Sequence, residues 1–352
     1  MADPNPRTIA ALRLQRQHLV SPATHAEYDD LFRALSPVTT VYWCRPGEPP
    51  RLVHRTVFDD LAYNDHRRAG RDILKGRFLG GAIGYVDRRD LELFACATRK
   101  ALPLHTRLEE ELLTLLRHEG PMTIGQMKEA TGHLVRNITP ALHRLQHAFE
   151  VFEDQIDRDW DRGFYRMESE FPELDLARYT PVEAAAELVR RWLPLAVAAD
   201  ATQMRDYFRL PAAVAKAVLA LLRERDEVVA VGAGLVALPG DAALLGKTLE
   251  PTPSVFALHR ADPLVRQHES ALKARFAHPQ WETLFYLLVD GQFVGAVVGA
   301  FKQGPFVLED VLLTLPDDEK TRRREEIAQA IYEINDPERS PLRRWDGKEL
   351  EL

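Results

Sequence analysis

The chain has 352 residues, of which 45% are hydrophobic and 28% are charged, a composition typical of a soluble globular protein with two or three domains. It has no apolar run near the roughly 20 residues that a membrane-spanning helix needs, and its polar N-terminus lacks the apolar stretch of a secretory signal. The net charge of −7 argues against a protein that coats nucleic acid without specificity, although arginine and histidine clusters at 66–71, 133–147 and 321–324 allow a local basic face.

The first hundred residues have an irregular pattern. We expect helices over 7–19 and 22–35, followed by a turn-rich stretch. Four glycines then occur within 73–86, but their spacing fits neither a phosphate-binding loop nor a dinucleotide fingerprint. We therefore expect these glycines to let strands or helices approach closely.

Cysteine usage bears on the compartment and on metal sites. Cys44 and Cys96 are too few and too isolated for a disulfide framework or a zinc site. A reducing cytoplasm is the expected location.

Residues 104–172 predict three helices and a hairpin. The first helix covers 106–118, and Thr123 caps a short second helix. The expected inner face of the third helix consists of Leu134, Ile138, Leu142 and Leu145. Apolar and polar residues then alternate over 149–153, which predicts a strand, and a second strand follows at 164–167. This order is the plan of a winged helix-turn-helix module.

The same plan recurs over 173–250. Thr180-Pro181 begins a helix over 182–193, and 228–238 provides a compact hairpin. The matching apolar positions of the third helix are Leu210, Val214, Val218 and Leu221. Two matching units in tandem are stronger evidence for the module than one.

The two copies present different faces to solvent. In the first copy, the candidate DNA-binding residues of the third helix are His133, Arg136, Asn137, His143, Arg144 and His147. In the second copy this face is mostly alanine, with Lys216 and Arg223 as the cationic exceptions. We interpret the first copy as the DNA-facing one and the second as partly structural. The alternative is an ordinary solvated face, since winged helices also bind proteins.

A metal site at this face is not expected. His143 and His147 lie four apart, which is the spacing of a metal-binding pair. However, the run His-Arg-Leu-Gln-His lacks the usual glutamate, and the sequence offers no evident third ligand.

The C-terminal third changes to β structure. Strands are expected over 254–258, 284–289, 293–300 and 306–315, with a strong hairpin signal at Asp290-Gly291. A charged helix over 317–334 follows. These strands predict a small sheet or barrel packed against the helical modules.

Two stretches of this region resemble the AlkZ/YcaQ-like DNA glycosylases. They are 255–266, with the string Asp-Pro-Leu-Val-Arg as the closest match, and 287–295. Residues 13–19 also resemble the first helix of that family, so the similarity, although diffuse, covers most of the chain. The resemblance implies three tandem winged helices and a β-barrel, and the excision of alkylated or crosslinked bases without a metal or cofactor.

The family's catalytic motif is not matched. Members carry Gln-x-Gln or Gln-x-Asp after the first helices, whereas the corresponding segment 35–41 offers only hydroxyls as candidate catalytic groups, on Ser36, Thr39 and Thr40. The string Gln15-Arg16-Gln17 lies inside the predicted first helix, which is not the position of the motif.

The missing carboxylate matters because cleavage of an N-glycosidic bond builds positive charge on the sugar while a water is held at the anomeric carbon. A threonine hydroxyl orients water but is a poor base without charge. We therefore expect slower catalysis unless Glu48, Asp59 or Asp60 folds into the site. The alternative is that Thr39 and Thr40 are simply two hydroxyls in a β-prone turn.

Taken together, the sequence predicts an α+β protein of tandem winged helix-turn-helix modules with a C-terminal β-barrel-like domain. Its expected parts are an N-terminal winged-helix-like domain over 1–103, winged helices over 104–172 and 173–250, and a β-rich domain with a terminal helix over 251–352.

Three classes of function remain open. The first is a divergent DNA glycosylase that acts on alkylated or crosslinked bases. The second is a DNA-binding or regulatory protein without catalysis, and a protein-interaction scaffold is the third. Duplex DNA is the expected partner in the first two, and no membrane partner is expected.

Overall fold

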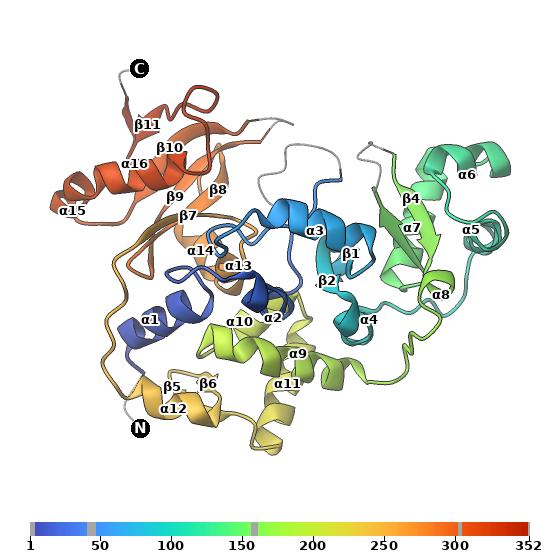
Figure 1. Ribbon diagram of the computed structural model, residues 1–352, viewed down its shortest axis with the longest axis horizontal. Coiled ribbons are helices and arrows are strands. Elements are labelled where there is room, and N and C mark those ends of the chain that lie inside the picture. Colours follow the sequence, from blue (N-terminus) through green and yellow to red (C-terminus); the bar gives the residue numbers. More distant parts are fainter. Residues whose placement is uncertain (1–3, 41–46, 156–160, 302–304, 351–352) are drawn as a thin grey trace.

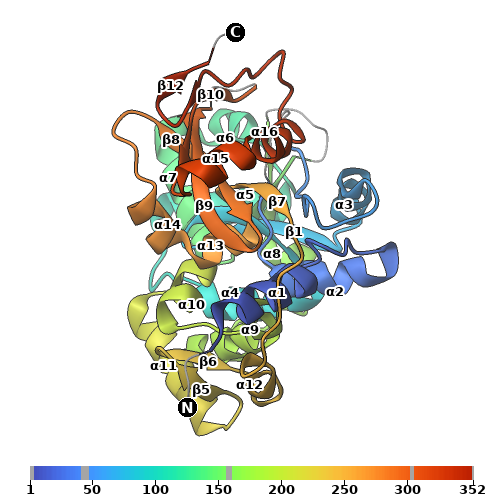
Figure 2. The same cartoon turned by 90° about the vertical axis from the view of Figure 1, so that its left-hand side faces the viewer.

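The computed structural model describes residues 4–40, 47–155, 161–301 and 305–350. It combines helices with antiparallel strands, which confirms the predicted α+β class. In Figures 1 and 2 the C-terminal sheet lies at the top and the helices α9, α10 and α11 lie below it. Figure 1 shows helices α5, α6 and α7 at the opposite side from the sheet. Cys44 lies outside the described residues, whereas Cys96 is a buried free thiol.

The N-terminal segment begins with helices that local capping defines. Its elements are α1 (Pro6–Arg16), α2 (His25–Leu35), α3 (Asp60–Ala69), β1 (Ile73–Leu79), β2 (Ala82–Asp87), the 3-10 helix η1 (Arg88–Asp90) and α4 (Leu91–Thr98). Asn5 caps α1, and Thr24 begins α2 with a capping box. Strands β1 and β2 form an antiparallel hairpin whose turn contains Gly80 and Gly81 at φ 62° and 108°. These positive φ angles explain the two glycines, because they strain residues with a side chain.

Residues 107–166 contain three helices and a hairpin in the predicted order. The elements are α5 (Arg107–His118), α6 (Ile124–Thr131), α7 (Val135–His147), β3 (Val151–Asp154) and β4 (Gly163–Arg166), followed by the single turn α8 (Met167–Glu170). Capping boxes at Thr106 and Thr123 begin α5 and α6. Leu134 does not belong to the inner face as predicted, since it is the N-cap residue of α7 and is 49% exposed. The helical periodicity applies only from Val135 onward, and the other three predicted positions are fully buried.

The next segment repeats this order of elements. It contains α9 (Pro181–Ala196), α10 (Ala201–Phe208), α11 (Ala212–Glu224), β5 (Val229–Gly232), β6 (Leu235–Ala237) and α12 (Pro239–Leu245). Helix α9 packs against α4 and α11. Its Trp192 is 1% exposed and lies 4.6 Å from the ring of Tyr207, centroid to centroid. Burial of such large aromatic surfaces makes this segment the centre of the main core.

The C-terminal segment forms a sheet with helices on its faces and edges. Its elements are β7 (Val255–His259), α13 (Pro263–Gln267), α14 (Glu269–Arg275), β8 (Glu282–Val289), β9 (Gln292–Ala300), β10 (Val307–Leu313), α15 (Asp317–Arg322), α16 (Arg324–Tyr332), β11 (Arg344–Trp345) and β12 (Lys348–Glu349). The hairpin prediction at Asp290-Gly291 is confirmed, with both residues at positive φ between β8 and β9. The predicted single helix over 317–334 is instead two helices that meet at Arg323.

The predicted barrel-like closure is not observed. Among the described residues, six strands pair in the order β12-β11-β10-β9-β8-β7, so the sheet is open with β7 and β12 at its edges. The pairing of β10 with β11 is parallel, whereas the other pairs are antiparallel. Helix α16 packs against the edge strand β7, and its Ile327 and Ile331 join the apolar cluster of the sheet.

The basic cluster at 66–71 does not form an exposed face. Arg67 and Arg68 are 4% and 2% exposed. Arg67 pairs with Asp87 at 2.9 Å, and its guanidinium lies 4.8 Å from the ring centroid of Phe32. These arginines hold α3 against its neighbours, so they are not available for phosphate contacts.

None of the helices in the described ranges is both long enough and apolar enough to cross a bilayer.

Candidate nucleic-acid interface and catalytic cavity

The segment that follows α2 carries the three predicted catalytic hydroxyls. Ser36 is buried, and its Oγ donates to the carbonyl oxygen of Phe32 at 2.8 Å, one turn back in α2. Val38 pairs with Tyr85 of β2 through two backbone hydrogen bonds, which fixes the direction of the following residues. Thr39 Oγ1 donates to the carbonyl oxygen of Ala261 at 3.2 Å, and Thr40 Oγ1 donates to that of Glu48 at 3.3 Å. The three hydroxyls therefore do not form one cluster.

Of these three residues, Thr39 lines a cavity of about 520 Å³. The charged and aromatic lining residues that matter for the argument are Arg209, Arg266, Glu269, Lys273 and Trp281. They come from the end of α10, from α13 and α14, and from the residue before β8. The cavity thus joins the segment after α2 to the C-terminal sheet and to the second three-helix segment.

Glu269 brings a carboxylate into this cavity. It is 7% exposed and forms ion pairs with Arg209 and with Lys273, the latter at 2.5 Å. Arg209 is the left-handed C-cap residue of α10 at φ 56°. A Cβ at Gly80 would lie 3.2 Å from the Cβ of Arg209, so the turn of the β1–β2 hairpin packs directly against this arginine. The hairpin glycine thereby helps to place the cation that holds Glu269.

Arg266 is a buried cation at the cavity, whereas Arg209 and Lys273 are exposed. It is 3% exposed, and its guanidinium lies 4.4 Å from the ring centroid of Tyr207. Its Nη2 is 3.5 Å from the carbonyl oxygen of Leu35, whereas its Nε and Nη1 have no hydrogen-bond partner among the described residues. Burial lowers the pKa of this guanidinium. The end of α2 and the cavity are thus linked through one arginine.

The alternative carboxylates considered from the sequence are engaged elsewhere. Asp59 caps α3, and the carboxylate of Asp60 accepts from the backbone of Leu52 at 2.6 Å and from the hydroxyl of Tyr28 at 3.0 Å. Neither they nor Glu48 line the cavity that Thr39 faces.

Gln17 likewise serves packing. Its amide donates to the carbonyl oxygen of Leu195 at 3.2 Å, and Gln17 is 1% exposed.

The predicted DNA-binding residues at the start of and along α7, other than its two histidines, fall into an exposed group and a group that is paired with α5. Arg136 and Asn137 are exposed in its first turn. His133 and Arg144 are instead turned toward α5, where they contact Glu111 at 3.3 Å and Glu109 at 2.5 Å. The first pair is therefore available to a partner, while the second pair is already held by carboxylates.

The two histidines of α7 face the β1–β2 hairpin. A Cβ at Gly81 would lie 3.0 Å from Cε1 of His147. Arg77 of β1 donates to the carbonyl oxygen of Gly81 at 2.7 Å and to Gln146 at 2.8 Å. Partial burial, together with nearby cations that include Arg77, lowers the pKa of both His143 and His147, so both are neutral at pH 7.

The other two predicted DNA-binding residues, Lys216 and Arg223, lie away from α7. Both are exposed on α11, which both views place at the lower edge of the molecule, whereas α7 lies higher (Figures 1 and 2). The structure thus brings α7 and the β1–β2 hairpin together and leaves the cations of α11 at a different edge.

Sequence reasoning missed the residues that complete the cavity. Arg266 ends the Asp-Pro-Leu-Val-Arg string, and Glu269 follows three positions later, so the local signal was available. Arg209 and Trp281 have no local signal, because their role depends on which elements pack together. The same is true of Arg77, which lies outside the cavity, between the β1–β2 hairpin and α7. Among the described residues, no three His, Cys, Asp or Glu side chains gather closely enough to hold a metal ion.

Comparison with known proteins places these observations in a family context. The family described as DNA glycosylase AlkZ-like matches residues 5–331 of the chain. Among solved structures, the DNA glycosylase AlkZ of Streptomyces sahachiroi has a similar fold, with a TM-score of 0.70 and 16% sequence identity over 97% of this chain and 100% of that chain. No curated protein matches the sequence.

Proposed function

The chain belongs to the AlkZ-like DNA glycosylase family, and on that premise we propose that it binds duplex DNA and hydrolyses the N-glycosidic bond of an alkylated or crosslinked base. The observation that carries the proposal is the cavity that Thr39 lines together with the buried carboxylate of Glu269 and the buried guanidinium of Arg266. The cytoplasmic location expected from the cysteines is part of the same proposal.

The DNA-binding part of the proposal rests on the repeated order of three helices and a hairpin. We interpret 104–172 and 173–250 as winged-helix modules, 1–103 as a third related unit, and 251–352 as the β-rich domain. Arg136 and Asn137 are exposed where α7 begins, which is where a recognition helix reads base edges. His143, His147 and Arg77 form a polar surface beside them that suits contacts to the DNA backbone.

The catalytic part assigns roles to two side chains. Thr39 Oγ1 orients a water, and the Glu269 carboxylate holds that water and stabilises the positive charge that develops on the sugar. The water oxygen bonds to the anomeric carbon, and the N-glycosidic bond breaks with its electron pair leaving on the base. The water proton passes to the carboxylate. Ser36 and Thr40 have no part in this step, since neither lines the cavity. The Thr39 hydroxyl donates its proton to the carbonyl oxygen of Ala261, so its oxygen orients the water by accepting a hydrogen bond from it.

Trp281 provides a surface for the displaced base. Its side chain lines the same cavity, and its indole Nε1 has no hydrogen-bond partner in the described ranges. An aromatic face can stack a base of any sequence, which fits an enzyme that recognises damage.

Base excision can be tested directly. The purified protein is incubated with duplex DNA that carries an N7-alkylated guanine or an interstrand crosslink, and alkali then converts abasic sites to strand breaks. Breaks that depend on the protein are expected. Their absence with every lesion tested would remove the glycosylase proposal.

The Glu269 assignment has a matched control. Glu282 lines the same cavity but is 65% exposed and pairs with Arg260 at the surface. We expect Glu269→Gln to slow strand breakage by about a hundredfold or more, the range for loss of a positioned carboxylate. Glu282→Gln should leave the rate within about twofold, because an exposed pair contributes little. Equal rates for both variants would show that another group positions the water.

The absence of a glutamine or carboxylate at 36–40 favours one alternative, a DNA-binding protein without catalysis. This alternative predicts salt-sensitive binding to duplex DNA with no strand breaks. A protein without affinity for duplex DNA at low salt would instead be an interaction scaffold.

A further inference from the structure

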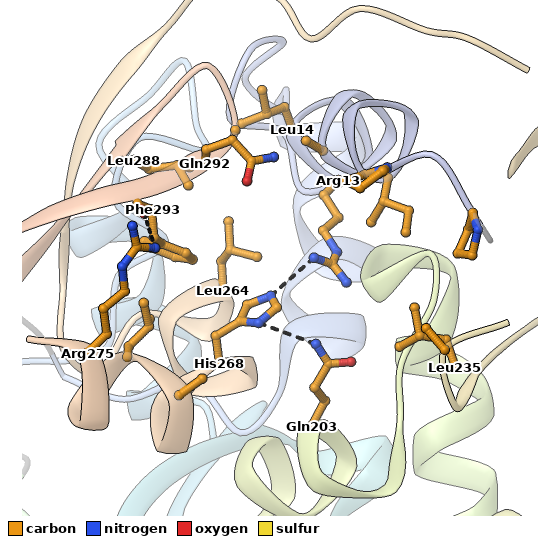
Figure 3. A pocket seen from close by; sticks show the side chains of 18 residues that line it. Arg13, Leu14, Gln203, Leu235, Leu264, His268, Arg275, Leu288, Gln292 and Phe293 are labelled. Atoms are coloured by element: carbon orange, nitrogen blue, oxygen red, sulfur yellow. Dashed lines mark hydrogen bonds between the residues drawn. The ribbon is translucent and has the colours of Figure 1, made fainter. Parts of the chain in front are cut away.

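A second cavity, of about 560 Å³, lies between α1, the ends of β8 and β9, and helix α14 (Figure 3). Its volume falls within the range of about 300–1,000 Å³ that is usual for small-molecule sites. Most of its wall is apolar, with Ile9, Leu14, Leu235, Leu264, Leu288 and Phe293 among the lining residues. Helix α14 separates it from the first cavity, since Leu272 and Arg275 face one side and Glu269 and Lys273 the other.

Arg13 places a cation in the wall of this second cavity. Its Nε donates to the carbonyl oxygen of Ala196 at 2.8 Å and its Nη2 to that of Ala198 at 2.9 Å, while its Nη1 lies 3.1 Å from Nε2 of His268. None of its partners is an acid, and among the described residues Arg13 forms no ion pair. Burial lowers the pKa of this guanidinium to about 10, so it remains charged at pH 7.

His268 is a neutral group beside Arg13. Burial, with Arg13 nearby, lowers its pKa to about 3. Because arginine only donates, Nε2 accepts and the ring proton lies on Nδ1. The amide nitrogen of Gln203 lies 3.3 Å from Nδ1 (Figure 3), and because both groups then carry protons, this contact adds no hydrogen bond to the ring. The imidazole is therefore uncharged at pH 7, and it leaves the positive charge of Arg13 without a counter-charge among the described residues.

Arg275 adds a second cation at the exposed mouth. Its Nη1 donates to the carbonyl oxygen of Phe293 at 2.9 Å and its Nη2 to Thr314 at 2.7 Å. It too has no ion-pair partner in the part of the chain that the structure describes, and no described residue that lines this cavity is acidic. The cavity is therefore an apolar space with two positive charges and no compensating carboxylate.

From this combination we infer that the second cavity binds a small amphipathic anion, with an apolar body against the leucines and Phe293 and a carboxylate between Arg13 and Arg275. Such a ligand supplies the negative charge that the described lining lacks and covers the exposed apolar wall. The inference is independent of base excision, because none of its residues lines the cavity that contains Thr39.

Calorimetric titration of the full chain with octanoate and with octan-1-ol tests the inference. The two probes share an apolar tail, but only octanoate carries a charge. We expect saturable 1:1 binding of octanoate, and binding of octan-1-ol that is at least about tenfold weaker, because hydrogen bonds to charged groups contribute about 1.5–3 kcal/mol. Equal affinities would show that the arginines are not involved, and absence of saturable heat at millimolar octanoate would overturn the inference.

Two exposed positions on α14 provide matched variants. Ala271 lines the cavity, whereas Ala274, on the same helix, does not. We expect Ala271→Trp to abolish octanoate binding by filling the mouth and Ala274→Trp to leave the affinity within about twofold. Arg275→Gln should weaken octanoate at least about tenfold while leaving octan-1-ol unchanged. Octanoate binding that survives both Ala271→Trp and Arg275→Gln would place the ligand elsewhere and refute the assignment.

Discussion

A buried ion pair connects the segment before α3 to the start of α13. Arg55 is fully buried, and its Nη1 and Nη2 donate to the two carboxylate oxygens of Asp262 at 2.7 and 2.9 Å. Asp262 Oδ1 also accepts from the backbone of Leu264 at 2.8 Å and so caps α13. The neighbouring carbonyl, of Ala261, accepts the hydroxyl of Thr39. This pair therefore supports the wall of the candidate catalytic cavity.

Replacement of Asp262 with alanine should be strongly destabilising. It leaves the guanidinium of Arg55 buried without a counter-charge, which typically costs about 3–5 kcal/mol. Loss of the cap on α13 adds about 1 kcal/mol. The free energy of unfolding should fall by about 4–6 kcal/mol in total. Asp262→Asn keeps an oxygen for the cap and should cost about 1 kcal/mol less than alanine.

Urea-induced unfolding at pH 7, followed by circular dichroism, measures these differences. Glu282→Ala is the control, because it removes one partner of an exposed pair and should cost no more than about 1 kcal/mol. The double variant Arg55→Met with Asp262→Leu removes both charges and should be more stable than Asp262→Ala. A free energy for Asp262→Ala within about 1 kcal/mol of the unchanged protein would refute the argument.

Three further predictions concern separate parts of the fold. Arg136→Ala should weaken duplex binding at low salt, as measured by fluorescence anisotropy. A slope of log affinity against log salt that falls by about one would indicate a phosphate contact, weaker binding with an unchanged slope would indicate a contact to a base edge, and unchanged affinity would exclude Arg136 from the interface. His268 has a pKa of about 3 when folded and 6.5 when exposed, so its contribution to stability is present above pH 6.5 and is lost as the pH falls toward 3. Over that window, His268→Asn should reduce the pH dependence of the unfolding free energy by up to about 1.4 kcal/mol per pH unit, and an equal slope in both proteins would contradict this. A Cβ at Gly299 would lie 1.9 Å from the carbonyl oxygen of Val307, so Gly299→Ala should lower the unfolding free energy by about 1–3 kcal/mol, whereas Gly240→Ala, with open space around it, should be neutral or stabilising.

Features that depend on neighbouring residues were predictable from the sequence. The capping threonines at 123 and 180 begin helices as expected, and Asp290-Gly291 forms the predicted hairpin turn. Both devices act within a few residues, so the sequence alone specifies them. The family resemblance was also carried by short strings, and the family comparison confirms it.

Features that depend on packing between distant segments were not predictable in this way. The burial of Arg67 and Arg68, which removes a predicted basic face, follows from where α3 lies in the fold. The sheet is open among the described residues, with α16 packed on β7, and the periodicity of the strands does not predict which element packs there.

The candidate catalytic cavity is the clearest case of this dependence. Thr39 and Glu269 are 230 positions apart in the chain, yet both line the same cavity. Hydrophobic periodicity predicts which face of each element is buried, but it does not predict which other element packs against that face. The sequence by itself thus determined the helices, the hairpins and the family, whereas the tertiary structure alone placed Thr39 and the Glu269 carboxylate in the wall of one cavity.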